Sequence, residues 1–259
     1  MKMLERVGQR TQDFFEYAGG LTLLAGSSAG FLARLRIRSA ETLSQAYLLG
    51  FQSLAIVALT SLFTGMVISL ESAVQAVQYG FGNFVGGAVA YASSRELGPM
   101  LTGIVVAGRA GSAIAAEIGS MVVTSQIEAL KSMGVEPARY LVVPRLLALL
   151  IMLPLLTIFA DVVSLLGGMW VAQTYAHISY QDFITSARTT IGMNDVLKGL
   201  LKTFAFAVII VLVGAFQGLR TTGGAAGVGK SVTGAVVIAM ILIFISNFVL
   251  SFLLYGASG

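Results

Sequence analysis

Few side chains in this sequence have the types and spacing that chemistry requires. The chain has no Cys and a single His, His177, which excludes disulfides, thiolate chemistry and multi-histidine metal sites. No nucleophile-base-acid arrangement and no catalytic pair of carboxylates can be argued from the spacing of the other residues. We therefore expect no catalytic residue, no metal site and no cofactor on this chain.

One segment satisfies the phosphate-binding P-loop pattern letter for letter. Residues 224–231 read Gly-Ala-Ala-Gly-Val-Gly-Lys-Ser. A working P-loop lies between a strand and a helix, where backbone N–H groups surround the phosphates. Apolar runs of membrane-spanning length flank this segment instead. We reject a nucleotide site here and expect a flexible turn, with Lys230 at the membrane surface.

Three charged residues interrupt apolar runs, and they are the best candidates for a functional site. They are Arg95, Glu96 and Asp161. A charge inside a membrane costs at least ~2.5–3.5 kcal/mol on insertion scales, so each should face another helix or a polar ligand. Neighbours on a helix point about 100° apart, so Arg95 and Glu96 are not expected to pair with each other. A lipid headgroup and a helix-packing contact both remain open for this pair, and a proton relay is open for Asp161.

The composition explains where these charges must lie. Hydrophobic residues make up 56% of the 259 residues and charged residues only 11%, with a mean hydropathy of +0.87. Soluble domains have about 45–50% and about 25%, respectively. This excludes a soluble enzyme, a disordered chain and a fibrous repeat, and predicts an integral membrane protein. The net charge of +4 fits the positive-inside rule, so no nucleic-acid partner is needed to explain it.

Apolar runs long enough to cross ~30 Å of hydrocarbon predict five spans in an all-α fold. We expect an N-terminal interfacial helix in residues 1–40 and one five-span domain in residues 41–259. The predicted spans are residues 46–72, 84–108, 146–170, 196–219 and 232–255.

The distribution of Lys and Arg predicts the orientation of the chain. With the N-terminus in the cytoplasm, most basic residues, including Arg34, Arg36 and Arg38, lie inside. Only Arg188, Lys198 and Lys202 then fall outside or near the outer edge. The C-terminus is therefore expected in the periplasm.

The polar stretch between spans two and three predicts a short amphipathic helix over about residues 118–136. Val123, Ile127 and Leu130 recur at helical spacing, and Gly134 is a typical helix stop. This helix is either an interfacial connector or a coupling helix, which docks a cytoplasmic motor and transmits its motion.

The outer end of span one has a polar and an apolar face side by side. Glu71 and Gln75 lie on the polar face, which suits a headgroup or water, while Met66, Leu70 and Val74 form an apolar face that could touch acyl chains. An exposed helix end and ordinary helix packing explain the two faces equally well.

Several blocks of sequence, taken together, resemble the MlaE family of ABC lipid permeases. They are residues 95–99 (Arg-Glu-Leu-Gly-Pro), 107–113 (Ala-Gly-Arg-Ala-Gly-Ser-Ala) and 116–119 (Ala-Glu-Ile-Gly). Glu128 followed by Gly134 also resembles the start of the coupling loop of ABC importers. The resemblance covers about residues 45–255.

This resemblance implies a permease that pairs with a second copy of itself around a lipid cavity. It implies a cytoplasmic ABC ATPase, which carries ATP and Mg, an MCE-domain protein on the other side, and a small STAS-type regulatory subunit. The implied cavity residues are Arg95, Glu96, Met66, Leu70, Glu71, Val74 and Gln75. The implied coupling residues are Glu117, Val123, Ile127, Glu128, Leu130 and Gly134.

We therefore expect the membrane subunit of an ATP-driven lipid transporter, with phospholipid as the substrate, in a bacterial inner membrane. A plastid inner envelope is the other membrane where such relatives occur. An ion-gradient-driven transporter or channel, with Asp161 and Glu96 as relays, is the alternative. An intramembrane enzyme would need clustered acidic residues and His or a metal site, which the sequence does not offer.

Overall fold

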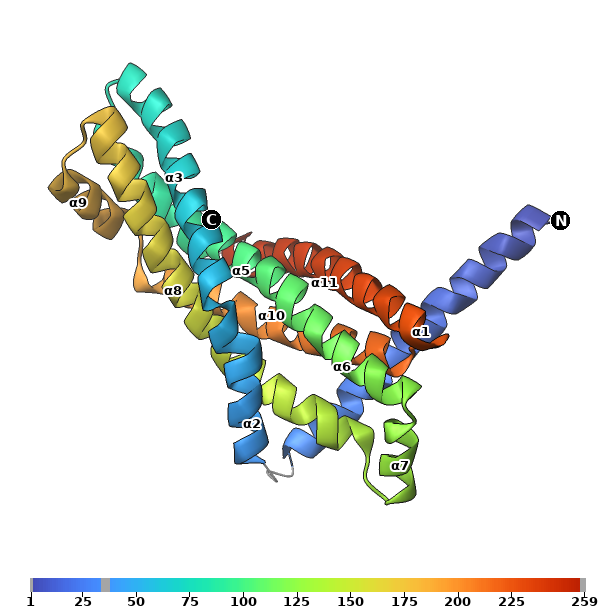
Figure 1. Ribbon diagram of the computed structural model, residues 1–259. Helices are drawn as coiled ribbons and strands as arrows, with labels where there is room; N and C mark the ends of the chain where they lie inside the picture. Colours follow the sequence, from blue (N-terminus) through green and yellow to red (C-terminus); the bar gives the residue numbers. More distant parts are fainter. Residues whose placement is uncertain (1, 34–37, 257–259) are drawn as a thin grey trace.

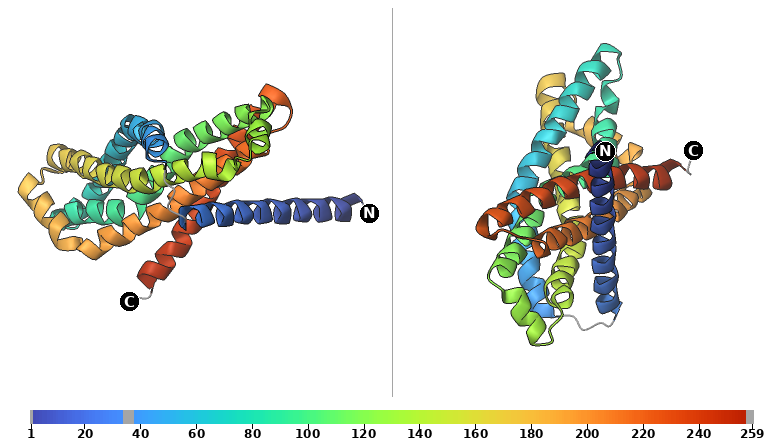
Figure 2. Two further views of the ribbon diagram at one scale, coloured as in Figure 1. Left: turned by 90° about the horizontal axis from the view of Figure 1, so that it is seen from below. Right: turned by 90° about the vertical axis from the view of Figure 1, so that its right-hand side faces the viewer.

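The computed structural model describes residues 2–33 and 38–256, and the regular elements in these ranges are all helical. Within the described ranges, five helical stretches are long and apolar enough to cross a membrane. Figures 1 and 2 show how the helices are arranged. The prediction of an all-α membrane protein is therefore confirmed. The stretches are Ser39–Ala76, Val85–Val123, Ala138–Ala176, Met193–Leu219 and Gly224–Tyr255.

Each of the first three spans is a chain of helical elements rather than one regular helix. Span one consists of α2 (Ser39–Gln45), η1 (Ala46–Gly50), η2 (Phe51–Ser53) and α3 (Leu54–Gln78). Span two follows η3 (Gly82–Phe84) and consists of α4 (Val85–Ala92), η4 (Ser93–Leu97), α5 (Gly98–Val106), η5 (Ala107–Gly111) and α6 (Ser112–Val123). Span three consists of η6 (Ala138–Val142) and α8 (Val143–Ala176). The spans are longer than the sequence predicts, because the helices continue through polar and charged residues at their ends.

The last two spans are single helices, α10 (Met193–Leu219) and α11 (Gly224–Tyr255). Two short helices lie at opposite ends of the bundle (Figure 1), α7 (Gln126–Ser132) between spans two and three and α9 (Tyr180–Thr190) between spans three and four. Helix α9 was not among the elements predicted from the sequence.

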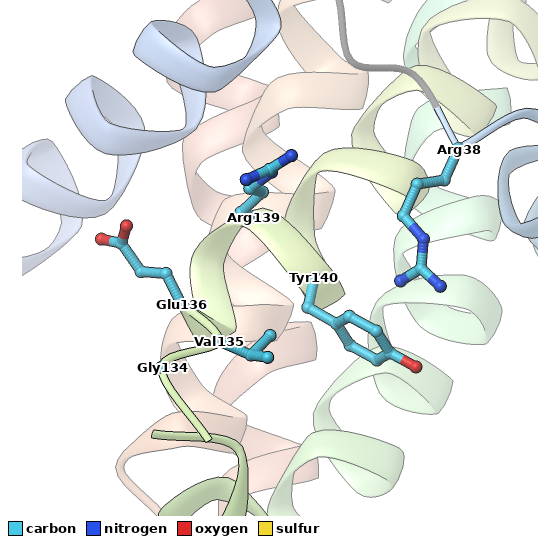
Figure 3. A pocket seen from close by; sticks show the side chains of 6 residues that line it. All are labelled: Arg38, Gly134, Val135, Glu136, Arg139 and Tyr140. Carbon is cyan, nitrogen blue, oxygen red and sulfur yellow. The ribbon is translucent and has the colours of Figure 1, made fainter. Parts of the chain in front are cut away.

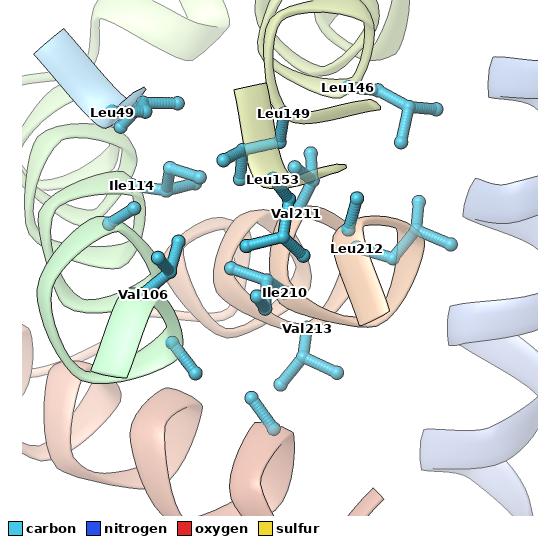
Figure 4. Close-up of a cluster of buried hydrophobic side chains, with 14 of the residues drawn as sticks. Leu49, Val106, Ile114, Leu146, Leu149, Leu153, Ile210, Val211, Leu212 and Val213 are labelled. Carbon is cyan, nitrogen blue, oxygen red and sulfur yellow. The ribbon is translucent and has the colours of Figure 1, made fainter. Parts of the chain in front are cut away.

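Helix α10 lies at the centre of the bundle and contacts α5, α6, α8 and α11. Its Phe206 and Ile210 are fully buried and belong to a hydrophobic core that also receives side chains from spans one, two and three (Figure 4). This central position is what brings polar groups of α10 against spans two and five.

Helices α3 and α8 pack against each other with very little space between their backbones. A Cβ added at Gly65 would collide with the carbonyl of Ser164, and one added at Gly167 would collide with the carbonyl of Leu62. The Ser69 hydroxyl donates a hydrogen bond to the carbonyl of Gly168 at 2.7 Å. Small residues and interhelical hydrogen bonds of this kind hold membrane helices together.

The N-terminal segment forms one helix, α1 (Lys2–Ala33), whose first half points away from the bundle (Figure 2). Its Tyr17 meets the Phe216 ring edge-on at 4.9 Å, and Glu16 pairs with Arg220 at 3.1 Å. Burial raises the pKa of the Tyr17 hydroxyl. The predicted interfacial arginines Arg34 and Arg36 lie outside the described residues.

The segment that mimics a P-loop is helical. Gly223 and Gly224 have φ values of 83° and 68°, which make a tight turn, and α11 begins directly at Gly224. The prediction of a flexible turn over residues 224–231 is therefore wrong. After the first turn of a helix, the backbone N–H groups donate hydrogen bonds to carbonyls of the same helix. They are therefore not free to bind phosphate, and this segment does not form a phosphate-binding loop.

Candidate functional site

A buried ion pair between Lys202 on α10 and Glu96 on η4 forms the centre of the candidate site. Their Nζ and Oε1 atoms are 2.9 Å apart, and the Lys202 side chain is fully buried. The ammonium also donates to the Ser251 hydroxyl at 2.7 Å and to the Arg95 carbonyl at 2.8 Å. All three ammonium protons therefore have acceptors, which offsets the cost of burying this charge.

Glu96 links three spans through one carboxylate. Besides Lys202 on span four, it accepts hydrogen bonds from Asn247 Nδ2 at 3.0 Å and from the Ser251 hydroxyl at 2.9 Å, both on span five. Its side chain nevertheless stays 37% exposed. The carboxylate is thus held in place on one side and open to a ligand on the other.

Arg95 points to a different set of partners from those of Glu96. Its guanidinium lies over the Tyr255 ring at 3.6 Å, and its Nε is 3.8 Å from Asp195 Oδ1. It also donates to the hydroxyl of Tyr91, one turn earlier in span two. The expectation that Arg95 and Glu96 would not pair with each other is confirmed.

A π-turn carries both charged residues. In η4, the Gly98 N–H donates to the carbonyl of Ser93, five residues earlier, and Pro99 follows at once. Proline cannot donate a backbone hydrogen bond, so the helix has to rearrange next to it. Single π-turns inside α-helices are frequent at functional sites. This one sets the directions in which Arg95 and Glu96 point.

The predicted cavity residues of span one lie apart from this cluster. On α3, Leu70 and Val74 are 37% and 41% exposed, Glu71 and Gln75 are exposed, and Met66 is partly buried. Helix α3 packs mainly on α8 and α4, whereas the contacts to the charged pair come from α4, α10 and α11. One copy of the chain therefore does not bring the two groups of candidate residues together.

Sequence reasoning missed most of the partners in the cluster. It counted Lys202 among the charges outside or near the outer edge of the membrane and did not foresee that this lysine is the most deeply buried charge of the described residues. The signal was present, since Lys202 lies two turns inside the predicted fourth span and such a charge needs an acidic partner. The other missed partners are Asp195, Asn247, Ser251 and Tyr255.

At the other end of the bundle, the predicted amphipathic helix over residues 118–136 is two helices. Helix α6 ends at Val123, Ser125 takes a left-handed backbone with φ 56°, and α7 then runs from Gln126 to Ser132. The predicted stop at Gly134 is confirmed, with φ 72°. The Val135 N–H bonds the Leu130 carbonyl and the Gly134 N–H bonds the Lys131 carbonyl, both at 2.9 Å, which completes a Schellman motif.

The predicted apolar docking face of this segment is also divided. Ile127 is 6% exposed and Leu130 packs on the main core, so both brace α7 against the bundle. Val123 belongs to α6 and is 41% exposed. The residues that α7 and its turn present outward include Glu128 and Met133, the latter 69% exposed.

Glu117 is tied into the bundle rather than free. Its carboxylate lies 2.7 Å from the guanidinium of Arg145, whose side chain is almost completely buried. Glu117 itself stays 53% exposed. It joins α6 to α8.

A cleft of about 370 Å³ opens beside the turn that follows α7 (Figure 3). Arg38, at the start of span one, stacks over the ring of Tyr140 at 4.4 Å on one side of it. The lining residues are Arg38, Gly134, Val135, Glu136, Arg139 and Tyr140. The cleft lies at the same end of the bundle as α7.

The described residues thus form an all-α membrane protein, a five-span bundle with a charge cluster between spans two, four and five and a short helix at one end. The chain belongs to the MlaE permease family, whose model, described as Permease MlaE, matches residues 42–253.

Relatives that resemble the chain over most of its length support this assignment. A probable ABC transporter permease protein of Synechocystis is 43% identical over 86% of this chain and 85% of its own length. A probable ABC transporter permease protein of Rickettsia typhi is 35% identical over 96% of both chains. The chloroplastic protein TRIGALACTOSYLDIACYLGLYCEROL 1 of Arabidopsis thaliana is 36% identical over 92% of this chain and 68% of its own.

Proposed function

We propose that the chain is the permease subunit of an ATP-driven transporter of glycerolipids, and that it works as a dimer coupled to a separate ATPase. Membership of a family of ABC transporter permeases supports the general class. The partly open charge cluster around Glu96, beside an apolar helix face, is the observation that carries the choice of a lipid.

A lipid has a charged or polar headgroup and apolar chains, and the site offers surface for both. Glu96 and Arg95 supply opposite charges at one point. Next to their partners on span five, Phe244, Phe248 and Phe252 follow one another along α11, with 53%, 73% and 70% of their surfaces exposed. An amphipathic ligand could place its headgroup at the cluster and its chains along these rings. The name of the chloroplastic relative refers to a galactolipid, which agrees with a glycerolipid substrate.

The exposed face of α11 supports pairing of two copies. Only 11% of the most apolar part of α11 is buried, against 61% for α10. A second copy would cover part of this surface and leave room for lipid between the two. The candidate residues of α3, which are separated from Glu96 within one copy, would then line the same cavity. ATP-driven movement of the two copies would open and close it.

The end of the bundle that carries α7 is proposed to dock the ATPase, which would hold ATP and Mg. Glu128 and Met133 face outward there, and the cleft of Figure 3 lies beside the turn after α7. The Glu117–Arg145 pair joins span two to span three at the same end. This end would then face the cytoplasm, and the α9 end would face the periplasm and an MCE-domain partner. A STAS-type subunit would bind on the ATPase side, and the membrane would be a bacterial inner membrane.

The docking proposal is tested by co-purification of the ATPase with variants at matched membrane expression. Glu128→Arg and Met133→Asp change only outward-facing side chains, so both should lower ATPase recovery while the bundle stays intact. A hot-spot contact is worth about 2 kcal/mol or more, so recovery should fall severalfold. Arg188→Ala, on α9 at the other end, is the matched control. Normal recovery in both variants would remove α7 from the proposal.

Two further variants separate docking from folding. Leu130→Ala should lower the stability of the bundle, because Leu130 packs on the core. Gly134→Val should distort the turn after α7, because a branched residue is strained at φ 72°. Loss of ATPase binding in these variants alone would mean that α7 has a structural role only.

A further inference from the structure

Asp161 is a buried carboxyl group in the middle of α8. The site described above gives it no partner and no role. Its side chain is 9% exposed, and its Oδ1 atom is buried without a hydrogen-bond partner. In the described part of the chain it takes part in no ion pair. Burying an ionised carboxylate without a partner costs free energy, so the negative charge of Asp161 must be neutralised by something other than an ion pair.

The charged groups on the surrounding helices are all engaged elsewhere or far away. On span two, Arg95 and Glu96 face α10 and α11, where Lys202 is paired with Glu96. On α8 the other charged side chain is Arg145, which is paired with Glu117 at the α7 end. Glu71 on α3 lies near the α9 end, and α4 and α5 have no charged residues. No cation in the described residues neutralises Asp161.

The position of Oδ1 identifies its neighbour. A Cβ added at Gly98 would collide with Asp161 Oδ1 and would lie 2.6 Å from the carbonyl oxygen of Ser93. Two oxygen atoms that both accept hydrogen bonds therefore face the same small space, which only a glycine at position 98 leaves open. Two acceptors so placed repel each other unless a proton lies between them.

The immediate surroundings are polar but hold no room for a large ligand. A cavity of about 10 Å³, the size of about one water molecule, lies beside Gly98. Its hydroxyl-bearing residues are Ser61, Thr64, Ser93 and Ser164, and the hydroxyls of Ser93 and Ser164 are 2.8 Å apart. Asp161 follows the lining residue Ala160 in sequence, but its carboxyl group is not part of the cavity lining.

We propose that Asp161 is a proton-binding site, and that its carboxylic acid donates a hydrogen bond to the Ser93 carbonyl. The proton comes from water and returns to it. Ser93 begins the π-turn that carries Arg95 and Glu96, so the neutral acid fixes that turn against span three. Loss of the proton places a carboxylate against a carbonyl and pushes span three away from span two. Asp161 is thus a positioning residue for the charge cluster.

Infrared spectroscopy of the transporter in lipid nanodiscs tests the proton directly. The wild-type protein should show a carboxylic-acid C=O band that shifts in heavy water and disappears in Asp161→Asn. Asp182→Asn, the same change at an exposed residue of α9, should leave the band unchanged. Absence of this band in the wild-type protein between mildly acidic and neutral pH would overturn the proposal, and this measurement needs no variant to fold.

Lipid transfer tests the positioning role, and this second readout rests on the proposed function. Asp161→Asn keeps a neutral hydrogen-bond donor, so transfer should stay near the wild-type level and should no longer fall as the pH rises. Asp161→Ala should lose about tenfold, the effect of one hydrogen bond. Equal losses in both variants, or stimulation by sodium ions that Asp161→Asn abolishes, would overturn the proposal. If the wild-type protein moves no lipid but shows the band, the proposed function fails and the proton site stands.

Discussion

The ion pair between Lys202 and Glu96 predicts an unequal response to removing its two members. Glu96→Gln removes the negative charge beside Lys202, which has no exposure to solvent, and leaves its ammonium with neutral acceptors such as the Ser251 hydroxyl and the Arg95 carbonyl. Breaking a buried pair in this way costs about 3–5 kcal/mol. Lys202→Met instead leaves a carboxylate that is 37% exposed and keeps two donors, Asn247 and Ser251. Its cost should lie nearer to that of an exposed pair, about 1–2 kcal/mol.

Thermal unfolding of the purified chain in detergent measures both losses on one scale. One kcal/mol corresponds to about 2–4 °C in Tm for a chain of 150–250 residues. The Tm decrease for Glu96→Gln should therefore be roughly twice that for Lys202→Met, or more. The double variant should be more stable than Glu96→Gln alone, because it leaves no buried charge. Lys198→Met, the same change one turn earlier on α10, is the control and should have little effect.

The opposite order would refute the reasoning about this site. If Lys202→Met destabilises the chain more than Glu96→Gln does, the carboxylate rather than the ammonium is the more deeply buried charge. Additive losses in the double variant would show that the two side chains do not interact.

Three further outcomes follow from the fold. Arg95→Ala should lower lipid transfer more than it lowers accumulation of the chain in the membrane, because Arg95 is partly exposed and is proposed to bind a headgroup. Transfer is measured at matched expression, and an equal loss of transfer and accumulation would favour a packing role for Arg95. The isolated chain should not bind ATP, and Lys230→Ala should leave lipid transfer by the whole complex unchanged. Saturable ATP binding by the isolated chain that Lys230→Ala abolishes would contradict the helical assignment of residues 224–231. A single Cys at Thr185 on α9 should react with an impermeant reagent from the periplasm and one at Ser132 on α7 should not, and the reverse labelling would invert the topology.

Much of the fold could be predicted from the sequence because the bilayer imposes it. A run of about 20 apolar residues forms a helix in hydrocarbon, because only a helix satisfies all its backbone hydrogen bonds within one segment. The charged residues mark where these runs end, so the five spans can be located from their positions. The charged pair Arg95 and Glu96 could be singled out for the same reason. The bounds could not be predicted, because helices in a bundle continue through residues such as Arg109, whose guanidinium reaches the Leu48 carbonyl at 2.8 Å.

The rest of the site depends on contacts between helices, and the periodicity of a sequence does not show which helices contact each other. Lys202 was counted as an outer charge, because the positive-inside rule assigns charges to loops and ignores partners buried in the bundle. Ile127 and Leu130 have the spacing of a docking face, but periodicity does not tell whether an apolar face meets a partner or the same chain. Helix α9 was missed because it is short and its pattern is interrupted by polar residues.

In the proposed function, this chain moves lipid only when a partner ATPase consumes ATP. The most direct measurement is transfer of a fluorescent phospholipid between liposomes and an acceptor, with the chain reconstituted alone and together with its ATPase. We predict no transfer by the chain alone, transfer with ATP and the ATPase, and loss of that transfer when Mg is removed. Transfer of equal rate driven by a proton or sodium gradient without ATP would contradict the account.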